Sequence, residues 1–229
     1  MTHTSHLLAL PTPQAVVFDL DGTLIDSRGD IAAACNHALR TLGREEIPVA
    51  RLATLVGDGG RSLVSRAFAV SIDDPIVEEA FALYLEYYRQ HPIDETRYLD
   101  GAEAALAAFP RLAIALATNK PRSTTIAILD ALGIRDRFGA IAAGGDGPLK
   151  PDPASLFTIA KTLGVAIEHV WMIGDGPQDV GAAKAAGAVS VGVLGGFHEQ
   201  RLIDAKPDVL FPSMRAFVDA AHSMVTPNS

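Results

Sequence analysis

Short apolar segments alternate with segments of helical periodicity along much of the chain. The apolar segments are rich in Val, Ile and Ala, and each ends in a polar or glycine-containing turn; they cover residues 15–18, 112–117, 140–143, 170–173 and 189–193. Alternation of this kind is typical of βαβ units, in which buried parallel strands are joined by helices. The pattern therefore predicts an α/β fold with a parallel sheet.

The pattern changes between residue 26 and about residue 99. One apolar stripe at helical spacing runs from Ile31 to Leu42 and another from Ile76 to Tyr88, and no strand is expected between them or beside them. This segment is predicted to be an all-helical insert with hinges at 25–27 and 91–101. The predicted domains are a core formed by residues 1–25 and 100–229, and a helical domain over residues 26–99.

The composition limits the class of protein and the cellular compartment in which it would function. A chain of 229 residues with one cysteine, Cys35, can bury a large core and cannot form an internal disulfide, which suits a reducing compartment. The segment 1–14 lacks a basic region and is too short for a signal sequence or a membrane span, so we expect a cytoplasmic location.

The net charge of the chain limits the kinds of partner that it can bind. A formal net charge of -8 argues against nucleic-acid binding and against binding to an anionic membrane, since both require a positive surface. An anionic substrate would need local cations. All five lysines lie in the second half of the chain.

The first apolar segment ends at a pair of carboxylates, Asp19 and Asp21. Side chains two residues apart on an extended strand point the same way, and like charges so close disfavour each other's ionisation unless a cation is present or one keeps a proton. Such a pair can supply one ionised nucleophile or metal ligand and one acid. The structural alternative is an Asx-turn or helix cap, which needs only one carboxylate.

Three later turns carry complementary groups. Thr118 and Asn119 follow a predicted strand and offer a hydroxyl and N–H groups to a phosphoryl oxygen, although either residue could cap a helix. Lys150 stands beside Pro151 in a stiff loop as a point charge for phosphate, or as a solvated lysine. Asp175 and Asp179 offer oxygens to a divalent cation such as Mg²⁺, or favour a helix N-terminus.

The carboxyl ends of parallel strands meet at one edge of an open α/β sheet, so these four turns are expected to converge. A nucleophile, a hydroxyl, a cation and metal ligands together predict phosphoryl transfer. Uncatalysed hydrolysis of phosphate monoesters is among the slowest reactions, and no single group would accelerate it enough.

These turns resemble the haloacid dehalogenase superfamily, whose signature is a D-x-D-G-T turn, a later Thr or Ser, a Lys and a closing acidic turn. The segments most similar to phosphoglycolate phosphatases within it are 56–61, 118–121, 144–146 and 150–153. The resemblance implies a Rossmann-like core with an inserted helical cap. One departure is Gly176, where relatives commonly have serine. We expect weaker support for the metal-binding loop there, because a hydroxyl is lost.

The resemblance also implies roles. Asp19 would attack phosphorus to form an aspartyl-phosphate, and Asp21 would protonate the leaving oxygen and then activate water. The implied Mg²⁺ ligands are Asp19, the main-chain carbonyl of Asp21, and Asp175, with Asp179 nearby. The implied phosphoryl-binding groups are Thr118, the Asn119 backbone and Lys150.

Several reactions of the superfamily remain to be separated. Residues 26–99 contain no lysine, which argues against Schiff-base cleavage of carbon–phosphorus bonds, and Asp21 favours a phosphatase over a dehalogenase.

The expected function is Mg²⁺-dependent hydrolysis of a small phosphorylated metabolite, 2-phosphoglycolate, by a monomer or homodimer. Arg61 is a candidate for binding a substrate carboxylate, or a solvated arginine. The alternatives are a sugar-phosphate mutase of the β-phosphoglucomutase type and a non-catalytic binding protein.

Overall fold

The core is a parallel six-stranded sheet of the order β5-β4-β1-β6-β7-β8 in a computed structural model that describes residues 10–109 and 113–225. Its strands are β1 (Ala15–Phe18), β4 (Ala113–Pro121), β5 (Ala140–Gly144), β6 (Val170–Gly174), β7 (Val189–Val193) and β8 (Val209–Phe211). The parallel α/β core and its five predicted strands are thereby confirmed. Leu112, the predicted start of the second strand, lies outside the described residues.

Helices cover both faces of this sheet, which explains why β1 is apolar at every position. The core helices are α6 (Ala102–Ala107), α7 (Arg122–Ala131), α8 (Ala154–Leu163), α9 (Pro177–Ala186), α10 (Glu199–Ala205) and α11 (Met214–Val225), with 3-10 helices at Arg135–Arg137 and Ile167–His169. Ala15 and Val17 pack with α8 and α9, whereas Val16 and Phe18 pack on the opposite face with α6, α7 and α11.

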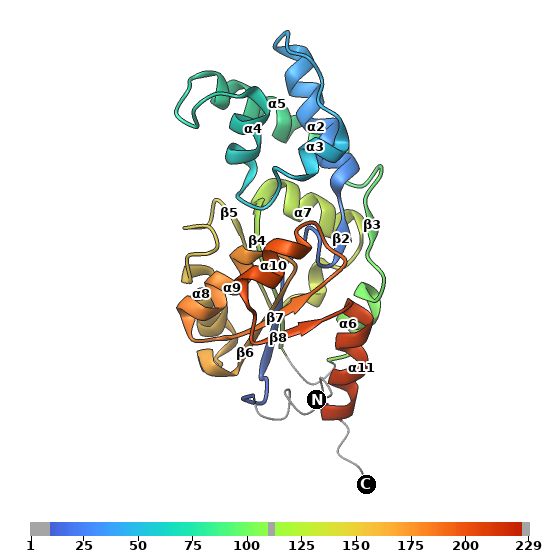
Figure 1. Ribbon diagram of the computed structural model, residues 1–229, viewed down its shortest axis with the longest axis vertical. Coiled ribbons are helices and arrows are strands. Elements are labelled where there is room, and N and C mark those ends of the chain that lie inside the picture. Colours follow the sequence, from blue (N-terminus) through green and yellow to red (C-terminus); the bar gives the residue numbers. More distant parts are fainter. Residues whose placement is uncertain (1–9, 110–112, 226–229) are drawn as a thin grey trace.

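Four helices form a separate layer at one end of the molecule, above the sheet in Figure 1. They are α2 (Arg28–Thr41), α3 (Val49–Ala53), α4 (Gly60–Phe68) and α5 (Ile76–Gln90). We call this layer the cap. The apolar stripes predicted for it include Ala38 and Tyr88, both fully buried.

The cap joins the core through two extended segments that pair with each other. Strand β2 (Ile25–Asp26) is antiparallel to β3 (Arg97–Tyr98), with Asp26 opposite Arg97. The expectation of no strand between residues 26 and 99 is therefore wrong at the hinge. Two residues are too few to show the period-2 pattern by which a strand is predicted from sequence. These two short strands form because the hinge segments lie side by side. Within the described residues, no helix has both the length and the apolarity required to span a membrane.

Candidate active site

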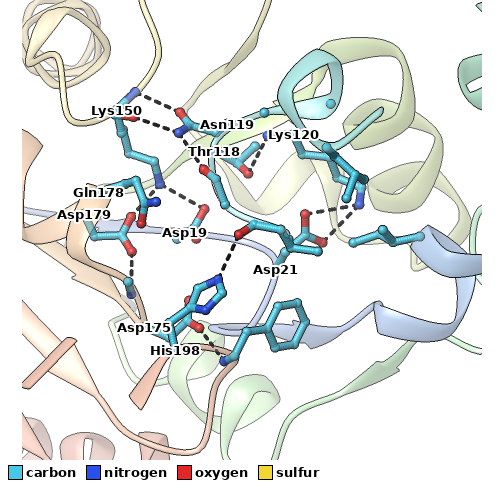
Figure 2. A pocket seen from close by; sticks show the side chains of 18 of the residues that line it. Asp19, Asp21, Thr118, Asn119, Lys120, Lys150, Asp175, Gln178, Asp179 and His198 are labelled. Atoms are coloured by element: carbon cyan, nitrogen blue, oxygen red, sulfur yellow. Dashed lines mark hydrogen bonds and ion pairs between the residues drawn. The ribbon is translucent and has the colours of Figure 1, made fainter. Parts of the chain in front are cut away.

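The four predicted turns meet at the carboxyl edge of the sheet, beneath the cap. They line a cavity of about 50 Å³, shown in Figure 2. Strand β1 leads to Asp19 and Asp21, β4 contains Thr118 and Asn119, and β6 leads to Asp175. All these residues, together with Lys150 and Asp179, contribute to its wall. The topology thus brings together every predicted core residue of the site.

Lys150 lies between two carboxylates. Its Nζ is 3.0 Å from Asp19 Oδ1 and 2.6 Å from Asp179 Oδ1, and it also donates to the carbonyl of Ala117 at 2.6 Å. The lysine and Asp179 side chains are almost fully buried. Burial lowers the pKa of Lys150, but Asp179 and Asp19 offset this effect, so the pKa rises above its usual value. Lys150 therefore remains an ammonium ion.

Asp175 is held in place by hydrogen bonds and by two glycines. Thr23 Oγ1 donates to its Oδ1 at 3.3 Å, and the main-chain N–H of Phe197 donates to Oδ2 at 2.7 Å. An ideal Cβ at either Gly22 or Gly196 would lie 2.3 Å from Asp175 Oδ2. Only glycine leaves room for this carboxylate at these two positions.

The carboxylates of Asp19, Asp175 and Asp179 outnumber the ammonium group that they face. Burial, followed by the charges of Asp179 and Asp21, raises the pKa of Asp19 to about 7 against the attraction of Lys150. Burial, with the charges of Asp19 and Asp179, likewise raises the pKa of Asp175 well above its usual value. A further cation would allow all three groups to ionise together.

The same carboxylates have the chemistry and spacing of a metal site. Each offers one oxygen, and these oxygens lie within 4.8 Å of one another. Opposite ligands of Mg²⁺ stand about 4.2 Å apart, so small side-chain movements would complete such a set. Asp179 also accepts a hydrogen bond from the Gly176 N–H at 3.1 Å, which fixes its second oxygen at the start of α9. The residues present therefore fit a divalent cation.

Asp21 faces a different set of groups. Lys120 Nζ is 3.1 Å from both of its carboxylate oxygens, and Ser27 Oγ donates to Oδ1 at 2.5 Å. Lys120 also donates to the hydroxyl of Tyr88, a cap residue, at 2.9 Å. Asp19 and Asp21 thus share one cavity but have separate partners, which suits two different roles.

The side chain of Asn119 holds the loops of the site together. Its Nδ2 donates to the carbonyls of Lys150 and Gly57, at 2.8 and 2.9 Å, and its Oδ1 accepts from the Lys150 N–H at 2.8 Å. Thr118 lines the cavity, and its Oγ1 accepts from the Lys120 N–H at 3.2 Å. The predicted phosphoryl-binding roles of Thr118 and Asn119 remain predictions.

Two further core residues hold the cap loop over the cavity. Gln178 Nε2 donates to Asp58 Oδ1 at 2.6 Å, and His198 Nε2 is 2.8 Å from the Val56 carbonyl. Burial lowers the pKa of His198, so its ring is neutral near pH 7 and donates this hydrogen bond. These two contacts tie the cap loop to the core at the edge of the cavity.

Gly176 lies beside both the carboxylate cluster and the residue that contacts the cap, since its neighbours are Asp179 and Gln178. An ideal Cβ here would be 2.8 Å from Gln178 Oε1 and 3.5 Å from Asp179 Oδ2. The absent side chain therefore leaves space in which Gln178 turns toward Asp58. The expected weakening of the metal-binding loop remains a prediction.

Arg61 stands apart from the other predicted site residues. It lines a neighbouring groove between cap and core rather than the catalytic cavity. It forms an ion pair with Glu78, and its guanidinium lies 5.5 Å from the centre of the Phe81 ring. In this closed arrangement Arg61 is not directed at Asp19.

Comparison with known proteins shows the family to which this arrangement of site residues belongs. The family model for haloacid dehalogenase-like hydrolases matches residues 13–187. The chain belongs to the haloacid dehalogenase-like hydrolases. It is 38% identical over 217 residues to a phosphoglycolate phosphatase of Neisseria meningitidis, covering 90% of this chain and 92% of the relative. It is 37% identical to one of Pseudomonas putida, covering 90% and 79%.

The fold comparison agrees with this family. A crystal structure of a predicted phosphoglycolate phosphatase from Haemophilus somnus matches with a TM-score of 0.82 and 24% identity, covering 92% of this chain and 99% of that one. The likeness confirms the predicted Rossmann-like core with a cap. The family match and the similar proteins together identify this chain as a phosphoric monoester hydrolase, as predicted.

Sequence reasoning gave no site role to Lys120, Gln178 or His198. Lys120 directly follows Thr118 and Asn119 in a segment already similar to phosphatases, and that adjacency was a usable signal. Gln178 and His198 act on the cap through contacts across 120 and 142 residues. Nothing local in the sequence indicates those two contacts.

Proposed function

We propose that this protein is a Mg²⁺-dependent phosphatase that hydrolyses 2-phosphoglycolate through an aspartyl-phosphate at Asp19. The observation that carries the proposal is the shared cavity, in which Asp19 faces Lys150 and the carboxylate cluster while Asp21 faces Lys120 and Ser27. The curated relatives named phosphoglycolate phosphatase support the substrate.

The first half-reaction transfers the phosphoryl group to the enzyme. An oxygen of ionised Asp19 attacks phosphorus, the bond from phosphorus to the ester oxygen breaks, and Asp21 gives its proton to that oxygen. Lys150 and the hydroxyl of Thr118 line the cavity where the phosphoryl oxygens would lie. Glycolate leaves, and Asp21 is then a carboxylate.

The second half-reaction regenerates the enzyme. Asp21 takes a proton from water, the resulting hydroxide attacks phosphorus, and the bond to Asp19 breaks to release inorganic phosphate. Bound Mg²⁺ would be held by Asp19, Asp175 and Asp179 and would neutralise the charge of the phosphoryl group. Ser27 and Lys120 keep Asp21 in position for both proton transfers.

Cavity size favours a small substrate. Pockets for drug-sized ligands measure about 300–1,000 Å³, whereas this cavity is about 50 Å³ and is narrowed by the cap loop, which hydrogen-bonds to Asn119 and Gln178. A two-carbon phosphate ester suits it better than a hexose phosphate, which a mutase would require.

The test is release of inorganic phosphate with and without Mg²⁺ from 2-phosphoglycolate, glucose 6-phosphate, pyrophosphate and an aminosugar phosphate, beside a mutase assay with β-glucose 1-phosphate. We expect Mg²⁺-dependent turnover with the highest kcat/KM for 2-phosphoglycolate. Conversion of β-glucose 1-phosphate to glucose 6-phosphate without net phosphate release would contradict the proposal.

A further inference from the structure

The cavity holds two ammonium groups, one at each end. In Figure 2, Asp19 and Asp21 lie between Lys150 on one side and Lys120 on the other. Among the described residues that line the cavity, these lysines are the only Lys or Arg side chains. Lys150 serves the carboxylate cluster at the Asp19 end, which leaves Lys120 as the cation at the opposite end.

Lys120 is buried in a polar corner formed by core and cap. Its side chain is 2% exposed, and its Nζ reaches both oxygens of Asp21 and the hydroxyl of Tyr88. The Nζ also lies 4.4 Å from the centre of the Tyr88 ring. An ammonium group has three protons, and two of these contacts go to the single carboxylate of Asp21. One of these two contacts can turn to a bound carboxylate while the other stays with Asp21.

The reaction geometry places a carboxylate of the substrate beside this corner. With phosphorus at Asp19, the ester oxygen must meet Asp21, which is its proton donor. In 2-phosphoglycolate the carboxylate is attached one carbon beyond that oxygen. A cation that already touches Asp21 is therefore within reach of the carboxylate of a bound substrate.

We propose that Lys120, held in place by the hydroxyl of Tyr88, binds the substrate's carboxylate and so selects phosphorylated 2-hydroxy acids over neutral phosphate esters. This inference rests on the proposed phosphatase activity. It makes Lys120 a specificity-determining residue as well as a partner of Asp21.

Two other basic residues near the cavity are poorly placed for this role. Arg61 lines the neighbouring groove and pairs with Glu78. His198 lines the cavity, but its Nε2 is engaged by the carbonyl of Val56. The prediction that Arg61 recognises the carboxylate and the present inference can be separated by experiment.

The experiment compares 2-phosphoglycolate with 2-hydroxyethyl phosphate, in which CH₂OH replaces the carboxylate. The quantity measured is the ratio of the two kcat/KM values, with Mg²⁺ present, for wild type, Lys120→Met, Tyr88→Phe and Arg61→Met. Loss of the Lys120 contact to Asp21 slows both substrates and cancels in the ratio, whereas loss of the carboxylate contact does not.

We expect Lys120→Met to lower the preference for 2-phosphoglycolate by about 10- to 100-fold, the range for a hydrogen bond between charged groups. Tyr88→Phe should lower it less, because the ammonium remains. Arg61→Met, the matched change outside the cavity, should leave the ratio within about twofold of wild type, as expected of a solvated surface charge. A ratio that falls in Arg61→Met and not in Lys120→Met would overturn the inference.

A binding measurement replaces the kinetic assay for any variant whose turnover is too slow for kcat/KM to be measured. Calorimetric titration in Mg²⁺ uses 3-phosphonopropionate, in which CH₂ replaces the ester oxygen of 2-phosphoglycolate, and propylphosphonate, which lacks the carboxylate; neither compound is hydrolysed. Lys120→Met should lose affinity for 3-phosphonopropionate alone; equal losses for both compounds would contradict the inference. Wild type that hydrolyses both esters without preference would refute carboxylate recognition while leaving the phosphatase intact. Wild type that hydrolyses neither would refute both.

Discussion

Replacing Asp19 with asparagine should change how the stability of the metal-free protein depends on pH. Burial raises the pKa of Asp19 from 3.8 to about 7, so the folded protein binds this proton more tightly than the unfolded chain does. The free energy of unfolding contributed by Asp19 therefore falls as pH rises between about 4 and 7. The asparagine side chain does not ionise in this range, so the variant lacks this contribution to the pH dependence of the free energy of unfolding.

The size of the effect follows from the two pKa values. Asp19 with a folded pKa of about 7 and an unfolded pKa of 3.8 lowers the free energy of unfolding by about 1.4 kcal/mol between pH 6 and pH 8. Lys150 keeps its ion pair with Asp179 in the variant, so the neighbouring contacts are largely preserved.

The assay is urea denaturation of wild type and Asp19→Asn in EDTA at pH 6 and pH 8, above the pI of about 5.3. Wild type should lose about 1.4 kcal/mol more than the variant over this range. Added Mg²⁺ should stabilise wild type at pH 8 more than it stabilises the variant, because it binds the ionised cluster. An identical pH dependence for the two proteins would refute the account of the buried carboxylates.

Two glycine positions give further predictions. Gly176→Ser should displace Gln178 from its hydrogen bond to the cap loop and raise KM about 3- to 10-fold; Gln178→Ala should do the same, and the double variant should be no worse than either. An additive double variant would contradict this. Gly22→Ala should raise the Mg²⁺ concentration for half-maximal activity at least about tenfold, because its Cβ would collide with Asp175. Gly43→Ala has a similar positive φ with no atom within 4 Å, so it should reproduce only the backbone cost of about 1–2 kcal/mol in urea denaturation. Equal metal affinities in the two alanine variants would refute the collision.

The buried strands of the sheet were predictable because both of their faces are covered. Residues 15–18 and 189–193 are apolar or small throughout, and the structure gives the same boundaries. The three residues of β8 form an edge strand that is too short for a pattern. The register of β4 shifts between Ala117 and Pro121, so the strand continues through residues that the sequence indicates as a turn.

The carboxylates and Lys150 of the site were predictable because the ends of parallel strands converge. The direction of Lys120 was not, since it depends on the irregular end of β4 and on Tyr88 from the cap. The cap contacts of Gln178 and His198 depend on how two layers meet, and a single sequence does not encode that distance locally. Tyr88 was expected to pack in the cap, and it does, but its hydroxyl also reaches Lys120.

The proposed mechanism depends on Asp19 as the nucleophile. Protein turning over 2-phosphoglycolate with Mg²⁺ is quenched in acid and treated with borohydride, which reduces an aspartyl-phosphate to homoserine, and its peptides are then analysed by mass spectrometry. We predict homoserine at position 19, with none in an Asp19→Asn protein, which should be folded and inactive. Homoserine at position 21 instead, or near-wild-type turnover by Asp19→Asn, would contradict the mechanism.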